Sequence, residues 1–504
     1  MMNRCAFVVL LILVLVLAGN VNHSPASDNK IEQGFVQGRI SQIERAVLLG
    51  YQLFSPDRLP PQYLPESDEI LKCGTSIVAD LRQNWNRLSP EDRNFFSAYL
   101  SRPSLPLDYV SPTGLFKLHY TLTGFSRVSD ADLDLSGVPD WVEEAALIFD
   151  HCYLIEVDSL GYEVPPADFE VEGPEIDVYI QNIGSYGYTD FDDTIPSTPY
   201  NDLTSYIIVD NDFEGSGFFT NGIDGLKVTA AHELFHVVQL GYNFREMDKS
   251  FFEMSSTWME DRVYDEINDY YQYLPSFMLS LNLPLSHGNG AHEYGGSLFI
   301  KFLQEAFSET TIRRSWELIR DFHSMNATNA ALIEAGSSLE TALVEFGLWN
   351  YFTGARSEQL SFYKEAANYP QVPVNQVLTF QTDTTIVDSS YYLTLHYYKL
   401  RPETSGYYSV AQQHERPEIW QTGVVIENQG EFFINPFAGN TVGQLGLVQG
   451  LSDVILIAAN TETPETLGES LFRLDKSKFS YQIRRQLLGR SQRVFPNPFN
   501  PEQH

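Results

Sequence analysis

Two histidines four positions apart constrain this chain more than any other feature. They lie in AAHELFHVVQLGY, residues 230–242, where apolar residues recur at helical spacing. In a helix, His232 and His236 lie one turn apart on one face, so both imidazoles can reach a single ion. Glu233 lies beside them, placed to take a proton from water. The alternative is a buried helix whose two histidines make ordinary hydrogen bonds. The motif favours a zinc-binding helix.

A zinc site that performs chemistry needs a third protein ligand and an open position for water. The stretch SFFEMSSTWMEDRVYDEIND, residues 250–269, predicts a second helix whose small residues allow close packing. Glu253 lies 17 positions after His236, and Glu260 lies seven further on, on nearly the same face. We expect Glu253 to be the ligand, and Glu260 to orient a ligating histidine or to be the ligand itself. Two carboxylates on a solvated face are the alternative.

These stretches resemble the glutamate-zincin class of metallopeptidases, in which a glutamate on the next helix completes the site. In the aminopeptidases of that class, glycine and alanine stand where this chain has Met254 and Ser256. Residues 110–320 are also similar to a family of uncharacterised secreted bacterial proteins identified as metalloproteases by their motif. The resemblance implies one zinc site with these residues: His232, His236 and Glu253 as ligands and Glu233 as the general base.

A tyrosine and two further histidines follow in SHGNGAHEYGGSLFIKFL, residues 286–303. Tyr294 matches the position at which the aminopeptidase relatives carry a tyrosine that stabilises the oxyanion. A tyrosine packed at a helix start is the alternative. His287 and His292 lie in a loop rich in glycine and asparagine, and we rank them below Glu253 as ligands.

A second metal signal is independent of the first. DLDLSGVPDWVE, residues 132–143, fits the twelve-position calcium loop, with Gly137 at position six and a helix directly after it. The predicted side-chain ligands are Asp132, Asp134, Ser136, Asp140 and Glu143. A strand rather than a helix precedes the loop, so it would be a solitary calcium loop. The alternative is an acidic turn that caps a helix.

The first residues are typical of a secretory signal. An unbroken apolar run extends from Cys5 to Ala18, which is short for a membrane span, and we expect a signal peptide over residues 1–26. Its removal leaves Cys73 and Cys152, which predict one disulfide in an exported protein. Two separate buried thiols are one alternative. The other is a thiolate of Cys73 that caps the metal in a latent precursor.

The charge balance limits the partners. With 32 basic against 66 acidic residues, the formal net charge is -34, which disfavours nucleic acid and anionic lipid. No stretch after the signal approaches membrane-spanning length, so we expect no membrane insertion of the mature chain. The expected partner is a protein or peptide substrate.

The C-terminal stretch RVFPNPFNPEQH resembles the opening strand of the sorting domains that send proteins through the outer membrane of gliding bacteria. Such domains continue for many tens of residues. We therefore expect residues 489–504 to be a linker and the start of a truncated sorting domain, with outer-membrane secretion machinery as a partner. The alternatives are an ordinary proline-rich linker and a periplasmic protein.

Pattern changes along the chain divide it into regions. Residues 27–108 are predominantly helical and form a subdomain or a prosegment; residues 109–368 mix strands and helices; residues 369–488 carry short β-rich runs that predict a sandwich. The expected fold class is α+β, with a zincin-like domain in the middle. We expect a secreted zinc metallopeptidase, stabilised by calcium. The alternative is a catalytically silent, calcium-stabilised cell-surface binding or adhesion protein on the same scaffold.

Overall fold

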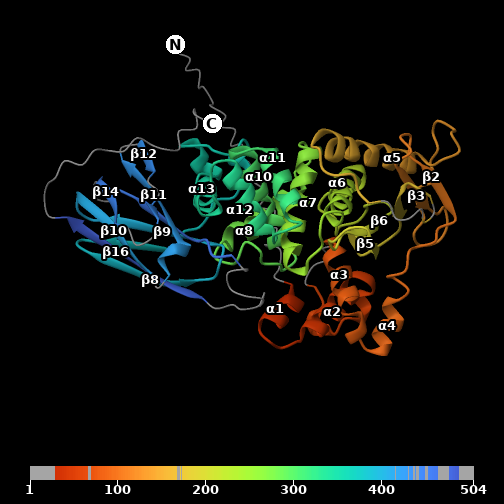
Figure 1. Ribbon diagram of the computed structural model, residues 1–504, viewed down its shortest axis with the longest axis horizontal. Coiled ribbons are helices and arrows are strands. Elements are labelled where there is room, and N and C mark those ends of the chain that lie inside the picture. The colour runs from red at the N-terminus through yellow and green to blue at the C-terminus, as the bar shows by residue number, and fades with distance from the viewer. Residues whose placement is uncertain are drawn as a thin grey trace, which may run out of the picture.

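The computed structural model is a mixed α and β protein (Figure 1). It describes residues 29–486 apart from 66–69, 167–170, 172, 415, 429–430, 435–436, 439–441, 449–451 and 464–475. The predicted signal peptide and the predicted sorting-domain start at 489–504 lie outside the described residues. No helix within the described ranges is long and apolar enough to cross a membrane.

The N-terminal region is helical but also contributes one strand, which the sequence analysis did not predict. Its elements are α1 (Lys30–Val36), α2 (Gln42–Phe54), β1 (Leu71–Cys73), α3 (Thr75–Gln83) and α4 (Pro90–Phe96). Helix α2 begins with a capping box, in which Ser41 and Glu44 each satisfy a backbone N–H of the other. Strand β1 pairs with a strand of the following region and so belongs to the sheet that this region forms.

The first sheet has six strands in the order β1-β5-β6-β4-β3-β2. The added strands are β2 (Leu107–Val110), β3 (Phe116–Tyr120), β4 (Ile176–Ile180), β5 (Ser185–Thr194) and β6 (Leu203–Val209). Strands β3, β4 and β6 are parallel, whereas β5 is antiparallel to β6. Strand β1 lies at the edge, parallel to β5.

Alternation along the strands gives this sheet two buried faces. On one face, Tyr179, Tyr188 and Tyr206 pack with apolar side chains of α2, α3 and α4. On the other face, Val178 and Ile207 pack against α5 (Asp140–Tyr153) and α6 (Gly222–Leu240). The N-terminal helices therefore complete the core of the sheet.

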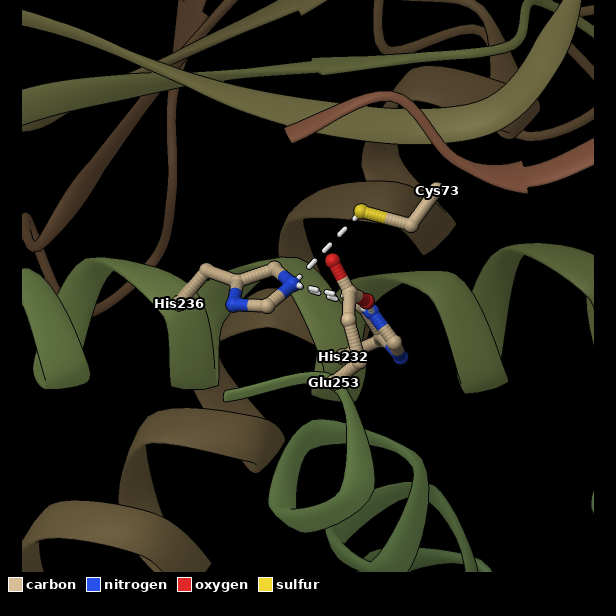
Figure 2. Close-up of side chains that lie close together, drawn as sticks. All are labelled: Cys73, His232, His236 and Glu253. Atoms are coloured by element: carbon tan, nitrogen blue, oxygen red, sulfur yellow. Dashed lines mark hydrogen bonds and ion pairs between the residues drawn. The ribbon is translucent and has the colours of Figure 1, made fainter. Parts of the chain in front are cut away.

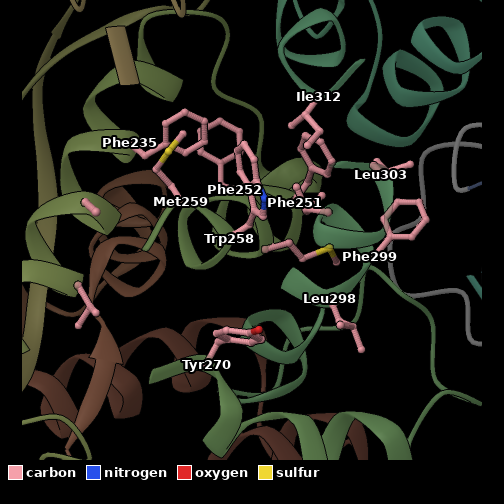
Figure 3. Packing of buried hydrophobic residues seen from close by; sticks show 14 of the residues in the cluster. Phe235, Phe251, Phe252, Trp258, Met259, Tyr270, Leu298, Phe299, Leu303 and Ile312 are labelled. Carbon is pink, nitrogen blue, oxygen red and sulfur yellow. The ribbon is translucent and has the colours of Figure 1, made fainter. Parts of the chain in front are cut away.

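Helices follow α6 and build the centre of the molecule (Figure 1). They are α7 (Lys249–Val263), α8 (Leu274–Leu279), α9 (His292–Gly295), α10 (Ser297–Ala306), α11 (Glu309–Leu318), α12 (Ser324–Glu334) and α13 (Leu339–Tyr351). Apolar side chains such as Phe235, Phe252 and Met259 form one large core here (Figure 3). This core fixes α6 against α7.

The C-terminal region consists of two sheets that enclose a second core. One has the order β14-β10-β16-β8 and the other β12-β11-β15-β9-β7, with β13 beside β11. The strands are β7 (Gln376–Phe380), β8 (Thr384–Ser390), β9 (Thr394–Pro402), β10 (Gly406–His414), β11 (Trp420–Asn428), β12 (Glu431–Ile434), β13 (Phe437–Ala438), β14 (Val442–Val448), β15 (Val454–Asn460) and β16 (Ser477–Gln486). Helix α13 packs on the second sheet. A Cβ at Gly347 would lie 2.9 Å from Ile457 Cγ2, so glycine allows this close contact.

The buried carboxyl group of Glu156 predicts that the stability of the fold depends on pH. Glu156, in the π-helical turn η4 (Leu154–Ser159), is fully buried, and neither carboxyl oxygen has a partner among the described residues. Burial raises its pKa well above 4.5, so the folded state keeps the proton that the unfolded chain loses. Wild-type stability should therefore fall, relative to Glu156→Gln, by up to about 1.4 kcal/mol per pH unit above the unfolded pKa. Urea unfolding at several pH values measures this difference, and a difference independent of pH would contradict it.

Candidate metal centre

Four side chains from three segments meet between α6, α7 and β1. Cys73, His232, His236 and Glu253 each offer one ligand atom, and these atoms all lie within 4.8 Å of one another (Figure 2). All four side chains are buried. Helix α6 supplies both histidines, α7 supplies Glu253 and β1 supplies Cys73.

The separations suit a tetrahedral ion. The Nε2 atoms of His232 and His236 are 3.1 Å apart, and Glu253 Oε2 lies 3.2 Å and 3.5 Å from them, respectively. Ligands at ordinary zinc distances in a tetrahedron are about 3.3–3.8 Å apart. The geometry therefore fits one zinc-sized ion at the centre of the group.

The outer hydrogen bonds of both imidazoles aim their lone pairs at this centre. His232 Nδ1 lies 2.7 Å from Glu260 Oε1, and His236 Nδ1 lies 2.7 Å from Gln239 Oε1. Both oxygens can only accept, because Glu260 is paired with Lys72 and the Gln239 amide nitrogen donates to Phe252 O. Each Nδ1 therefore donates its hydrogen, which leaves both neutral rings with an unprotonated Nε2 toward Glu253. Three acceptors that face one another require a cation between them.

The pKa values of His232 and Glu253 also indicate that positive charge stabilises this centre. Burial lowers the pKa of His232, but its hydrogen bonds to Glu253 and Glu260 outweigh this and raise it to about 9. Burial favours the neutral form of Glu253, yet the neighbouring His236 and His232 hold its pKa well below the usual range. Without a metal, a proton on His232 supplies the positive charge that stabilises Glu253 and Glu260.

Glu233 lies beside the centre and has one anchored and one unpartnered oxygen. Thr189 Oγ1 donates to Glu233 Oε2 at 2.8 Å, and Thr75 Oγ1 donates to the same oxygen at 3.2 Å. Oε1 is buried and has no partner among the described residues. Gly187 on β5 allows α6 to come this close, because a Cβ there would lie 3.0 Å from Glu233 Cγ. Oε1 is thus available to accept a proton.

The predicted disulfide between Cys73 and Cys152 is wrong, since both thiols are free and buried. Cys73 Sγ lies 3.5 Å from His236 Nε2. Cys152, on α5, lies in the main core, where its thiol contacts Tyr264 Oη at 3.9 Å. The two cysteines face different surroundings because β1 carries Cys73 to the edge of the sheet.

The residues of the predicted loop after Ser286 occupy different positions around the centre. Tyr294, on α9, is buried, and its ring centroid lies 6.3 Å from that of His232. Burial and the charge of Glu253 raise the pKa of Tyr294, so its hydroxyl keeps the proton that it could donate. His292 is outside the group of ligand atoms and lies 3.1 Å from Ser280 Oγ through Nδ1. Burial, with a contribution from His287, lowers its pKa to about 3.

A cleft of about 220 Å³ opens onto the centre. Its walls combine the N-terminal region, the helical centre and the C-terminal region: Glu32, Cys73, Glu253, His287, Tyr294 and Tyr392. The cleft is large enough for part of an extended chain to enter. Glu253 and Tyr294 both line this cleft.

Sequence reasoning missed several residues that position the centre. Gln239 lies three residues after His236 on α6, and its amide nitrogen also donates to Ser255 and Ser256 on α7. The i, i+3 spacing from a ligating histidine is the signal that could have identified it. Thr189 and Lys72 carry no comparable signal, because strand pairing and burial alone place them here.

The predicted calcium loop brings three of its carboxylates together. Ligand oxygens of Asp132, Asp134 and Asp140 lie within 4.8 Å of one another, whereas Glu143 is not in this group. Asp132 accepts from the backbone N–H groups of Ser136 and Gly137, both at 3.0 Å. The Ser136 hydroxyl donates to Val138 O at 3.2 Å. Oxygen ligands in a turn suit calcium, so the loop fits the ion with a smaller set of side chains than expected.

Calcium binding at this loop is expected to stabilise the fold. An ion that binds only the folded state adds about 2.7 kcal/mol at a hundredfold excess over its dissociation constant. Millimolar calcium should therefore raise the melting temperature of the wild type, while Asp132→Ala with Asp134→Ala should remove the increase. Differential scanning calorimetry with magnesium as the control ion tests this. An equal calcium response in both proteins would assign the loop to helix capping alone.

Comparisons with known proteins leave the family open. No protein-family model matches the chain, and no curated protein matches it. Solved structures match it over short stretches. PliG of Aeromonas hydrophila, a periplasmic inhibitor of g-type lysozyme, is 12% identical with a TM-score of 0.17, over 22% of this chain and 96% of that one. The pre-peptidase C-terminal domain of collagenase from Bacillus anthracis is 9% identical with a TM-score of 0.16, over 23% of this chain and 100% of its own.

Proposed function

We propose that the chain is a secreted zinc metallopeptidase of the glutamate-zincin type, with residues 109–368 as its catalytic domain. The observation that carries the proposal is the convergence of His232 Nε2, His236 Nε2 and Glu253 Oε2 within 3.5 Å of one another, beside Glu233. These are zinc-type ligands with oriented outer hydrogen bonds. The cleft that reaches Glu253 supplies room for part of a peptide.

The chain's own groups have distinct roles in this proposal. Zinc, when bound, polarises the scissile carbonyl and makes water a stronger acid. Glu233 accepts the proton of the attacking water through Oε1 and delivers it to the leaving amine. Thr189 holds the other carboxylate oxygen, which leaves Oε1 to accept the proton. Tyr294 donates a hydrogen bond to the oxygen on which negative charge develops.

Glu260 and Gln239 act through the histidines. Each accepts a hydrogen bond from one Nδ1 and so fixes the ring and its tautomer. In the conformation described, Lys72 and Asp269 extend this support, because Lys72 Nζ lies 2.9 Å from Glu260 Oε2 and 2.7 Å from Asp269 Oδ2. Replacement of these residues should weaken zinc binding without removing a ligand.

Zinc content and hydrolysis of unfolded casein test the proposal together. The purified chain should contain one zinc ion, and casein hydrolysis by a Cys73→Ser chain should be abolished by a zinc chelator and restored by zinc. The Cys73→Ser form is included because the wild-type thiol lies beside the ligand atoms. Bound zinc with no hydrolysis in either form would favour the catalytically silent binding protein.

A further inference from the structure

One short segment of the N-terminal region contacts His236, Glu233 and Glu253 of the proposed catalytic centre. Strand β1 pairs with β5 so that Cys73 lies opposite Gly187, and the Gly74 N–H donates to Gly187 O at 3.0 Å. Cys73 then reaches the ligand atoms, and the hydroxyl of Thr75 donates to Glu233. Ser76 Oγ donates to Glu253 Oε1 at 2.8 Å. We name residues Leu71–Ser76 the plug segment.

The sulfur of Cys73 lies close enough to the other ligand atoms to share one ion with them. It lies 3.5 Å from His236 Nε2 and within 4.8 Å of the other ligand atoms. Two histidines, one glutamate and one thiolate form a complete tetrahedral set for zinc. Zinc sites with four protein ligands are closed, whereas catalytic ones keep a position for water.

The plug segment is anchored on both sides of Cys73. Lys72 is buried and forms ion pairs with Glu260 and Asp269. Farther along, Asp80 on α3 forms ion pairs with Lys249 and Arg45. Lys249 begins α7, the helix that carries Glu253. Buried charge pairs are costly to separate, so these contacts hold the segment in one position.

We propose that Cys73 is the fourth zinc ligand and that the plug segment keeps the enzyme latent. The proposal rests on the zinc peptidase function argued above. While the segment is in place, its thiolate fills the position that water needs. It also pairs with β5, which becomes the edge strand of the sheet once β1 leaves, so that an extended peptide could add there as a strand.

Activation then requires displacement of the plug segment rather than loss of the whole N-terminal region. Helices α2, α3 and α4 cover Tyr179, Tyr188 and Tyr206 on the sheet, and their removal would expose this apolar face. A local movement of Leu71–Ser76, which includes the first two residues of α3, would instead open the metal centre and the edge of β5 while Ile77, Val78 and Leu81 of α3 stay in the core. The N-terminal helices therefore stay packed on the sheet, and the plug segment is attached to them.

Cobalt substitution tests the ligand assignment without a measurement of activity. A thiolate bound to Co²⁺ gives an intense near-ultraviolet charge-transfer band. The cobalt-loaded full chain and the matched control Cys152→Ser should both show this band, and Cys73→Ser should bind cobalt without it. Circular dichroism establishes that each variant is folded. Equal spectra for the wild type and Cys73→Ser would overturn the assignment.

Hydrolysis of unfolded casein by the same zinc-loaded proteins tests latency. If fewer than about one molecule in ten has an open site, Cys73→Ser should be about tenfold or more faster than the wild type and Cys152→Ser. Equal rates in all three would overturn latency even with the band present. A Cys73-dependent band with no hydrolysis in any form would retain the ligand and reject the peptidase. Hydrolysis with no such band would retain the peptidase and reject Cys73 as a ligand.

Discussion

Glu233→Gln is expected to keep its zinc and to lose peptide hydrolysis. The amide has nearly the same shape as the carboxylate and can still accept the hydrogen bond from Thr189, but it cannot take a proton from water. General base catalysis contributes about 10²–10⁴-fold, so hydrolysis should fall by at least that factor. We would measure this in a Cys73→Ser background, in which the fourth ligand position is open, with zinc content determined on the same samples.

The matched control for this variant is Glu246→Gln. Glu246 lines the same cleft but is not among the ligand atoms and makes no contact with Glu233 in the described structure. Its replacement should leave the rate nearly unchanged. Near-normal hydrolysis by Glu233→Gln would remove the basis for the zinc peptidase proposal.

The second prediction concerns zinc content and tests which glutamate binds the metal. In a Cys73→Ser background, Glu253→Ala should purify essentially without zinc, because only two of the proposed ligands, His232 and His236, then remain. Glu260→Ala should retain zinc with affinity or turnover reduced about 10–100-fold, since it removes only the partner of His232 Nδ1. Atomic emission measures zinc content after dialysis against a weak chelator.

Glu260→Gln serves as the conservative control for that comparison. Its amide oxygen still accepts from His232 Nδ1, so zinc affinity should recover toward the wild-type value even though the ion pair with Lys72 is lost. Circular dichroism of each variant distinguishes metal loss from unfolding. Zinc retained by Glu253→Ala and lost by Glu260→Ala would transfer the ligand role to Glu260.

Local sequence patterns predicted those elements whose defining residues lie within a few positions of one another. The stretch SPED, residues 89–92, favours a helix that Ser89 caps and Pro90 begins, and in α4 the Ser89 side chain accepts from Asp92 N–H. The spacing of His232 and His236 required one helix face, and α6 carries both. The mixed α and β class followed from the change of periodicity along the chain. Such signals depend on backbone geometry alone, so they can be read without the fold.

Contacts between segments far apart in the sequence could not be predicted from local sequence patterns. Strand β1 is only three residues long, and its partner β5 lies more than a hundred positions later. Because this pairing was not predicted, the approach of Cys73 to His236 was ranked below a disulfide with Cys152. The burial of Lys72 beside Glu260 depends on the same pairing. A strand of three residues is too short to show the alternation of apolar and polar residues by which strands are predicted.

Anomalous diffraction at the zinc absorption edge, from crystals of the full chain, locates the metal directly. We expect one strong peak enclosed by His232 Nε2, His236 Nε2 and a Glu253 oxygen at about 2.0–2.2 Å, with Cys73 Sγ at about 2.3 Å. A zinc-loaded crystal with no peak among these side chains, or with zinc bound only elsewhere, would contradict it.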